Sequence, residues 1–148
     1  QKYIESYFKK FPGIQDYMDK TKEYAHKFGF VETIFGRKCH YQDINSKNHA
    51  IRSFTERAAI NAPIQGSAAD IIRRAMININ NVFLDKNINT KMLLSVHDEL
   101  IFECPDNEAE EVKELIKYTM EAAAEPIIKL SVPIKVDIKV STNWDEAH

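Results

Sequence analysis

Two short apolar runs with a charged trio between them constrain the fold of this chain more than any other stretch. The runs cover Met92–Val96 and Leu100–Phe102, and each has the length and composition of a β-strand. Because Pro105 cannot donate to a sheet ladder, the second run ends before it. The simplest structure is a tight β-hairpin with three polar residues at its tip: His97, Asp98 and Glu99.

Two interpretations of this tip stay open from the residues alone. A hairpin rooted in a core can present carboxylates at its edge as metal-binding acids. Asp is also a common turn residue, because its side chain bonds nearby backbone and tolerates unusual dihedral angles. Where the chain stays extended, His97 and Glu99 share a side and Asp98 points away. We therefore do not expect all three side chains to bind one ion together.

Composition limits the class of protein. The 148 residues suffice for about one domain with a real core, and the 44% hydrophobic and 28% charged residues are ordinary for a globular protein. No apolar run approaches the roughly 20 residues that span a bilayer and no signal peptide is visible, so no membrane partner is expected. Cys39 and Cys104 are far apart and form no paired motif, which favours a reducing compartment and argues against structural zinc. Gln1 lies inside a predicted helix without an initiator Met, so we expect a piece of a longer protein.

The spacing of apolar residues predicts the other elements. Apolar residues three or four apart predict helices over residues 1–11, 14–28, about 53–84, and between 105 and 126. A second hairpin is predicted over 30–41, with Gly36 in its turn. Strict alternation predicts a strand over Val132–Val140, with Ile134, Val136, Ile138 and Val140 facing inward. The order indicates an α+β fold, in which the central hairpin and the C-terminal strand form an antiparallel sheet packed by helices.

The long predicted helix carries three polar residues at intervals of four. Arg57, Asn61 and Gln65 therefore share one helix face. All three side chains are donors of the kind that contact base edges and phosphates. A solvent-exposed face explains the same pattern equally well, so the residues alone leave both hypotheses open.

Several segments together resemble family A DNA polymerases, in the C-terminal part of their polymerase domain. The central hairpin is similar to motif C of that family, and the long helix to its palm helix. The resemblance covers the whole chain, and the combination of motifs is specific. The segments that carry it are Tyr7–Ile14, Gly29–Arg37, Glu56–Met76, Ser95–Glu103 and Asn143–His148.

The resemblance implies an organisation and an activity. Residues 1–50 would form the end of the fingers, a helical segment, together with the connecting hairpin, and residues 51–148 would belong to the palm. The parent chain would transfer nucleotides from a dNTP to a primer 3′ end, with primer–template DNA as its partner and Mg²⁺ as its cofactor. Such an activity would serve DNA replication or repair in the cytoplasm, in association with the nucleoid.

The resemblance also implies roles for single residues. Asp98 would be a catalytic carboxylate that binds the two metal ions of the reaction, and Glu99 would be an auxiliary acid beside it. His97 would lie against the primer strand near its end. The DNA-binding residues Arg57, Asn61 and Gln65 would face the minor groove, where hydrogen-bond acceptors are nearly independent of sequence.

Parts of the family's active site have no match in this sequence. These are the earlier strand with a metal-binding Asp and the fingers helix that holds the nucleotide. We therefore expect that the chain alone does not polymerise DNA, and that a sheet lacking one strand has an exposed apolar edge that favours self-association.

Two rival functions stay open. The first is a metal-dependent nuclease that uses His97, Asp98 and Glu99, with Asp137 as an additional acid. The second is a non-catalytic α+β module that binds nucleic acid.

Overall fold

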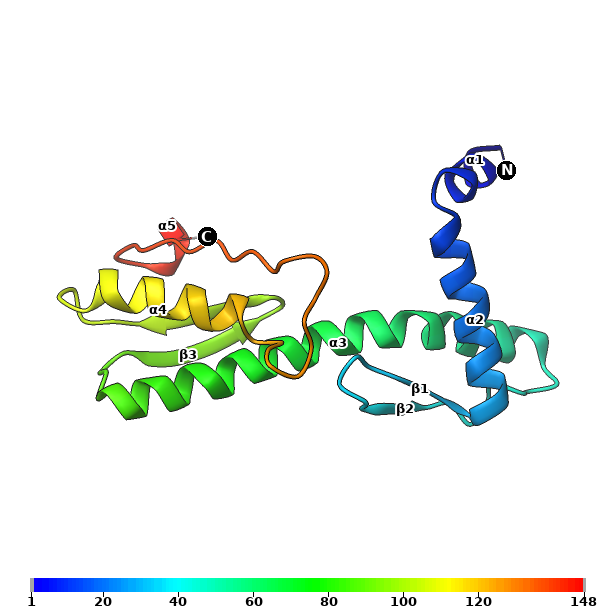
Figure 1. Ribbon diagram of the computed structural model, residues 1–148, viewed down its shortest axis with the longest axis horizontal. Coiled ribbons are helices and arrows are strands. Elements are labelled where there is room, and N and C mark those ends of the chain that lie inside the picture. The colour runs from blue at the N-terminus through cyan, green and yellow to red at the C-terminus, as the bar shows by residue number, and fades with distance from the viewer. Residues whose placement is uncertain (1, 148) are drawn as a thin grey trace. The chain divides into compact units, whose positions relative to one another are not determined.

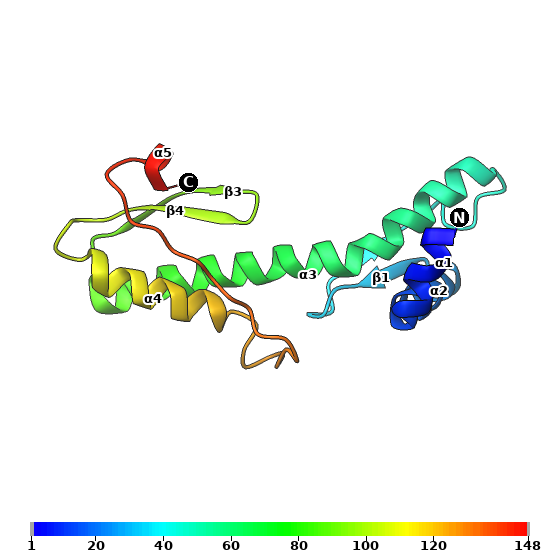
Figure 2. The same ribbon diagram turned by 90° about the horizontal axis from the view of Figure 1, so that it is seen from above.

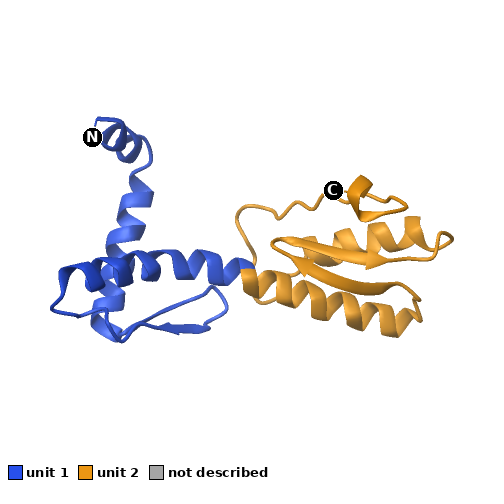
Figure 3. Ribbon diagram, turned by 180° about the vertical axis from the view of Figure 1, so that it is seen from behind, with its two compact units in different colours: residues 1–68 blue, residues 69–148 orange. Residues whose placement is uncertain are grey.

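The computed structural model describes residues 2–147 and contains helices and two small antiparallel sheets, which confirms the predicted α+β class (Figure 1). The chain divides into two compact units, residues 1–68 and residues 69–148 (Figure 3). In chain order the elements are α1 (Lys2–Lys10), α2 (Pro12–Phe28), β1 (Phe30–Glu32), β2 (Lys38–His40), α3 (His49–Lys86), β3 (Lys91–Val96), β4 (Glu99–Glu103), α4 (Ala109–Glu121) and α5 (Trp144–Ala147). No helix within residues 2–147 has both the length and the apolar character that a membrane crossing requires.

Two glycines set the local course of the first unit. Gly29 ends α2 with a φ of 76°, in the left-handed region that glycine enters without a steric penalty, and its N–H donates to the carbonyl of Ala25. Gly36 has a φ of 80° and turns the chain between β1 and β2, which pair in antiparallel fashion with Val31 opposite Cys39. The helix stop and the second hairpin predicted from the sequence are both confirmed.

The core of the first unit joins α2, the hairpin and the first half of α3. Ala25, Val31, Ile44 and Ala59 are buried together. Polar contacts reinforce this packing, because two tyrosine hydroxyls donate to backbone carbonyls of α3. Tyr17 donates to Ile60 at 2.7 Å and Tyr41 donates to Ala58 at 3.1 Å.

The core of the second unit lies between two helices and a hairpin. Ile79 and Phe83 of α3 pack with Val112 and Ile116 of α4, and apolar side chains of β3 and β4 complete the cluster. Figure 2 shows α3 and α4 on the same side of the β3–β4 hairpin. Met92, Leu100 and Phe102 of the hairpin are half-buried against this core. The hairpin is therefore rooted in a core, as the sequence predicted.

The C-terminal strand predicted over Val132–Val140 is wrong. Within the described residues the second sheet contains β3 and β4 alone, and residues 132–140 belong to neither sheet. The predicted alternation of buried and exposed side chains is seen in part. Ile134, Val136 and Ile138 are half-buried, but Val140 is 57% exposed. Alternation reports which side chains are covered, whereas a strand also needs a partner backbone. The Val136 N–H instead donates to the carboxylate of Glu121, at 3.2 Å.

Candidate functional site

The tip of the central hairpin is a two-residue turn. β3 ends at Val96, β4 begins at Glu99, and these two residues face each other in the ladder. His97 has a φ of 53°, the left-handed conformation that a two-residue hairpin loop needs at its first position. His is among the residue types enriched in that region. Because His97 and Asp98 form the turn, the alternation expected for an extended chain does not apply to them.

The hairpin presents its acids to solvent. His97, Asp98 and Glu99 are all exposed, and Glu99 is the first residue of β4. Within residues 2–147 no group of three or more His, Cys, Asp and Glu side chains is placed to hold a metal ion. The chemistry that this tip offers is therefore one or two exposed carboxylates at a two-residue turn.

Three of the four predicted DNA-binding residues are brought together on α3, whereas His97 lies at the hairpin tip. Arg57, Asn61 and Gln65 are exposed and line one shallow hollow of about 470 Å³. This arrangement contrasts with that of Arg52, whose guanidinium donates inward to the carbonyl of Ser46 at 2.8 Å. The predicted sharing of a helix face is confirmed, and the face belongs to the first unit, whereas the hairpin tip belongs to the second.

Two aromatic residues that sequence reasoning missed line the same hollow. Phe54 stands three residues before Arg57 on α3, and helical spacing was a signal that could have identified it. Tyr41 follows β2, and no sequence pattern linked it to the helix. Burial, followed by the influence of Cys39, raises the pKa of Tyr41 above its ordinary value. Its hydroxyl stays protonated and donates to the carbonyl of Ala58.

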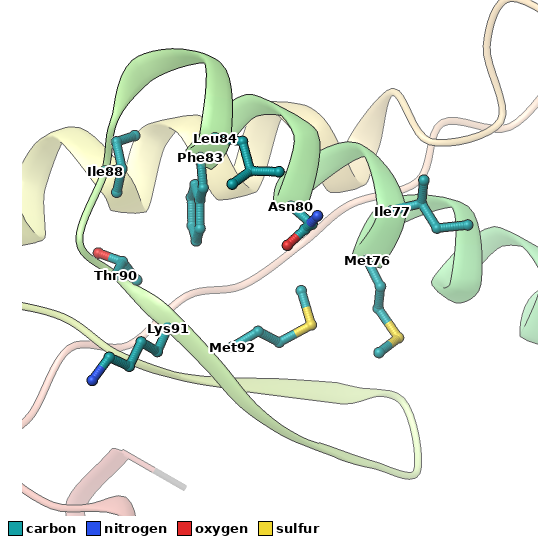
Figure 4. Close-up of a pocket in the computed structure, with 9 residues that line it drawn as sticks. All are labelled: Met76, Ile77, Asn80, Phe83, Leu84, Ile88, Thr90, Lys91 and Met92. Atoms are coloured by element: carbon teal, nitrogen blue, oxygen red, sulfur yellow. The ribbon is translucent and has the colours of Figure 1, made fainter.

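A larger hollow of about 570 Å³ lies in the second unit, between α3 and β3. Figure 4 shows the thioether side chains of Met76 and Met92 extending into it from the helix and from the strand. None of the predicted site residues lines this hollow. Volume alone therefore does not identify the part of the molecule that carries the charged and polar groups.

Comparison with known sequences decides the family. The sequence model of DNA polymerase family A matches residues 1–146. The chain belongs to DNA polymerase family A.

Individual family A polymerases are similar over nearly all of the chain. DNA polymerase I of Rhizobium leguminosarum is 53% identical over 148 residues, which are 99% of this chain and 15% of the relative. DNA polymerase I of Streptococcus pneumoniae is 50% identical over 145 residues, or 98% of this chain and 16% of the relative. The chain thus spans about one sixth of the length of these family A polymerases.

A solved structure of the family has the same fold. The POL domain of Pol1 from M. smegmatis, in complex with DNA primer-template and dNTP, superposes with a TM-score of 0.84 at 41% sequence identity. The match covers 89% of this chain and 23% of the solved one. The family resemblance and the mixed helix-and-sheet fold inferred from the sequence are both confirmed.

Proposed function

We propose that the parent chain of this family A polymerase segment catalyses template-directed DNA synthesis, by nucleotidyl transfer from a dNTP to a primer 3′ end. The observation that carries the proposal is the exposed Asp98 in the two-residue tip of a hairpin whose apolar side chains are half-buried against α3 and α4. The similar M. smegmatis domain was solved with DNA primer-template and dNTP, which supports the same substrates here.

Each residue of the tip takes a distinct role in this proposal. Asp98 is the metal-binding carboxylate, Glu99 is an auxiliary acid beside it, and His97 lies against the primer strand near its end. The left-handed turn at His97 supports this assignment, because backbone in a sparsely populated conformation is often kept where a side chain must be aimed. The half-buried apolar side chains of the hairpin would hold the acid in place while substrates exchange.

The carboxylate oxygens of Asp98 and Glu99 are ligands of the kind that Mg²⁺ prefers. This ion keeps several waters and takes one or two carboxylates together with substrate phosphates. When bound, Mg²⁺ would neutralise the charge that develops on the attacking 3′ oxygen and on the leaving pyrophosphate. Two ions need more carboxylate than Asp98 and Glu99 supply, so we infer that a further acid comes from another part of the parent chain.

The polar face of α3 would hold the nascent duplex. Arg57, Asn61 and Gln65 line one hollow and are exposed. The minor groove presents acceptors at nearly the same positions in every base pair, so donors there can check pair geometry without specifying sequence.

In this proposal residues 1–50 are the end of the fingers with its hairpin, and residues 51–148 belong to the palm. The DNA substrate would put the enzyme in the cytoplasm, with the nucleoid.

Primer extension tests the activity. The parent chain should extend a primer only when template, dNTP and Mg²⁺ are all present, whereas the 148-residue chain should not extend it under the same conditions. Mg²⁺-dependent cleavage of DNA without synthesis by the parent chain would favour the nuclease hypothesis. Extension by the isolated 148-residue chain would overturn the proposal that the site is shared with other segments.

The isolated chain should also self-associate through β3. The β3–β4 sheet has two strands within the described residues, and on β3 the side chains of Leu93 and Leu94 are 50% and 47% exposed. A strand edge with unpaired N–H and C=O groups is a template for pairing. Light scattering over a concentration series should give a mass that rises towards that of a dimer. A monomer mass at every concentration would contradict this.

A further inference from the structure

Phe54 is an apolar side chain on a surface otherwise suited to DNA. Its side chain is 68% exposed, although burying a phenyl ring is strongly favourable in water. It lines the same hollow of α3 as Arg57, Asn61 and Gln65. The proposed polymerase function assigns roles to those three polar residues and leaves Phe54 without one.

The rise of the helix gives the distance along α3 between Phe54 and the three polar residues. With a rise of about 1.5 Å per residue, Arg57 to Gln65 spans roughly 12 Å along α3, and Phe54 to Gln65 spans roughly 16 Å. Stacked base pairs are about 3.4 Å apart, so Phe54 lengthens the face by about one base pair, towards the N-terminus of α3. A duplex that contacts the polar trio would therefore also reach Phe54.

A phenyl ring would contact a different part of the duplex from the polar side chains beside it. It has no donor for the acceptors on the floor of the minor groove. The walls of the groove are sugars, and a deoxyribose presents C–H groups where a ribose carries its 2′-hydroxyl. A hydroxyl pressed against an apolar ring loses its hydrogen bonds to water, which costs free energy.

We propose that Phe54 packs against deoxyribose sugars of the bound duplex and makes this face prefer DNA over a duplex that contains RNA. The inference rests on the proposed function, because it takes duplex DNA as the occupant of the hollow. Two observations favour that occupant over a protein segment: the exposed polar residues that line the hollow beside Phe54, and the primer-template in the similar solved structure.

Binding measurements on the full parent chain test the proposal. The dissociation constant is measured without dNTP or Mg²⁺, for an all-DNA primer–template and for the same sequence with an RNA template strand. Phe54→Ala should weaken binding of the DNA duplex about ten-fold, the order expected for losing one buried aromatic contact, and should change binding of the RNA-containing duplex much less. Phe54→Leu, which keeps an apolar contact, should retain most of the preference for DNA.

The matched control is Ile64→Ala on the same helix. Ile64 is 62% exposed and does not line the hollow, so its substitution should change neither dissociation constant. Equal weakening of both duplexes by Phe54→Ala, or no weakening of either, would overturn the proposal. A lower melting temperature with an unchanged DNA-to-RNA ratio would identify a segment of the parent chain as the occupant. Because binding is measured without catalysis, the preference can hold or fail independently of primer extension.

Discussion

The guanidinium of Arg37 donates to the backbone carbonyl of Gly66, 3.1 Å away, and so ties the turn of the β1–β2 hairpin to α3. The N–H of Ile34 adds a bond to the hydroxyl of Ser67 at 3.0 Å. This close approach depends on Gly66, because a Cβ there would stand 2.8 Å from Cγ2 of Thr33 and 3.1 Å from the Arg37 guanidinium. Glycine is thus required at this point of the helix for steric reasons.

Gly66→Ala should push the hairpin turn away from α3. We expect the free energy of unfolding of the 148-residue chain to fall by about 1–3 kcal/mol, the usual cost of overpacking. Urea titration followed by circular dichroism measures it. The control is Gly13→Ala in α2, where a Cβ meets nothing within 4 Å and where alanine should stabilise by about 0.4–1 kcal/mol. Equal effects of the two substitutions would contradict the steric account.

His26 links three segments of the first unit. Its Nδ1 lies 2.8 Å from Oδ1 of Asn45, and its Nε2 lies 2.9 Å from Oε1 of Glu56 on α3. Asn45 in turn donates to the His26 carbonyl at 3.1 Å. His26→Ala should lower the free energy of unfolding by about 1–2 kcal/mol, because the half-buried carboxylate of Glu56 and the exposed amide of Asn45 both lose their partner. His49→Ala, at an exposed position of the same unit, should leave it unchanged.

Arg57 should contribute a charge contact to duplex binding. Each phosphate that a protein neutralises adds about −0.9 to the slope of log affinity against log salt. Arg57→Ala in the parent chain should therefore weaken binding of every duplex sequence alike and make the slope shallower by about one unit. Lys117→Ala, on the exposed face of α4, should leave the slope as it is. A change confined to some sequences would instead indicate a base-specific contact.

The hydroxyl of Tyr41 should make stability sensitive to alkaline pH. Burial, more than the nearby Cys39, raises the pKa of Tyr41 above its ordinary value of 10. The folded state therefore favours the protonated phenol. This stabilisation is present below pH 10 and is lost as the pH rises through the raised pKa.

Tyr41→Phe removes the bond to the Ala58 carbonyl, so at pH 7 it should lower the free energy of unfolding by about 1 kcal/mol. The difference between wild type and variant should shrink above pH 10, as measured by urea titrations across the alkaline range. A difference that grows with pH would contradict the assigned direction of the pKa shift.

Local chemistry made much of this fold predictable. Gly29 and Gly36 occupy two of the positions that have a positive φ, and Pro105 follows the strand that it terminates. The hairpin tip followed from its flanking apolar runs, and the shared face of Arg57, Asn61 and Gln65 followed from helical spacing. These features depend on residues close together in the sequence.

The errors concern contacts between distant segments. The stretch Val132–Val140 has the alternation of a strand, but alternation cannot report whether a partner backbone lies within the chain. Tyr41 reaches the hollow because the first unit packs its hairpin on α3, which no local pattern encodes. The exposure of Phe54 likewise depends on what the rest of the fold leaves uncovered.

The rate of primer extension by the parent chain, wild type against Asp98→Ala, tests the central proposal most directly. If Asp98 binds the catalytic metal, the rate should fall at least about a hundred-fold while the affinity for duplex DNA is kept. Asp137→Ala, which removes another exposed carboxylate of the second unit, should leave the rate unchanged. Undiminished extension by Asp98→Ala would show that the tip of the hairpin is only a turn and that the catalytic acid lies elsewhere.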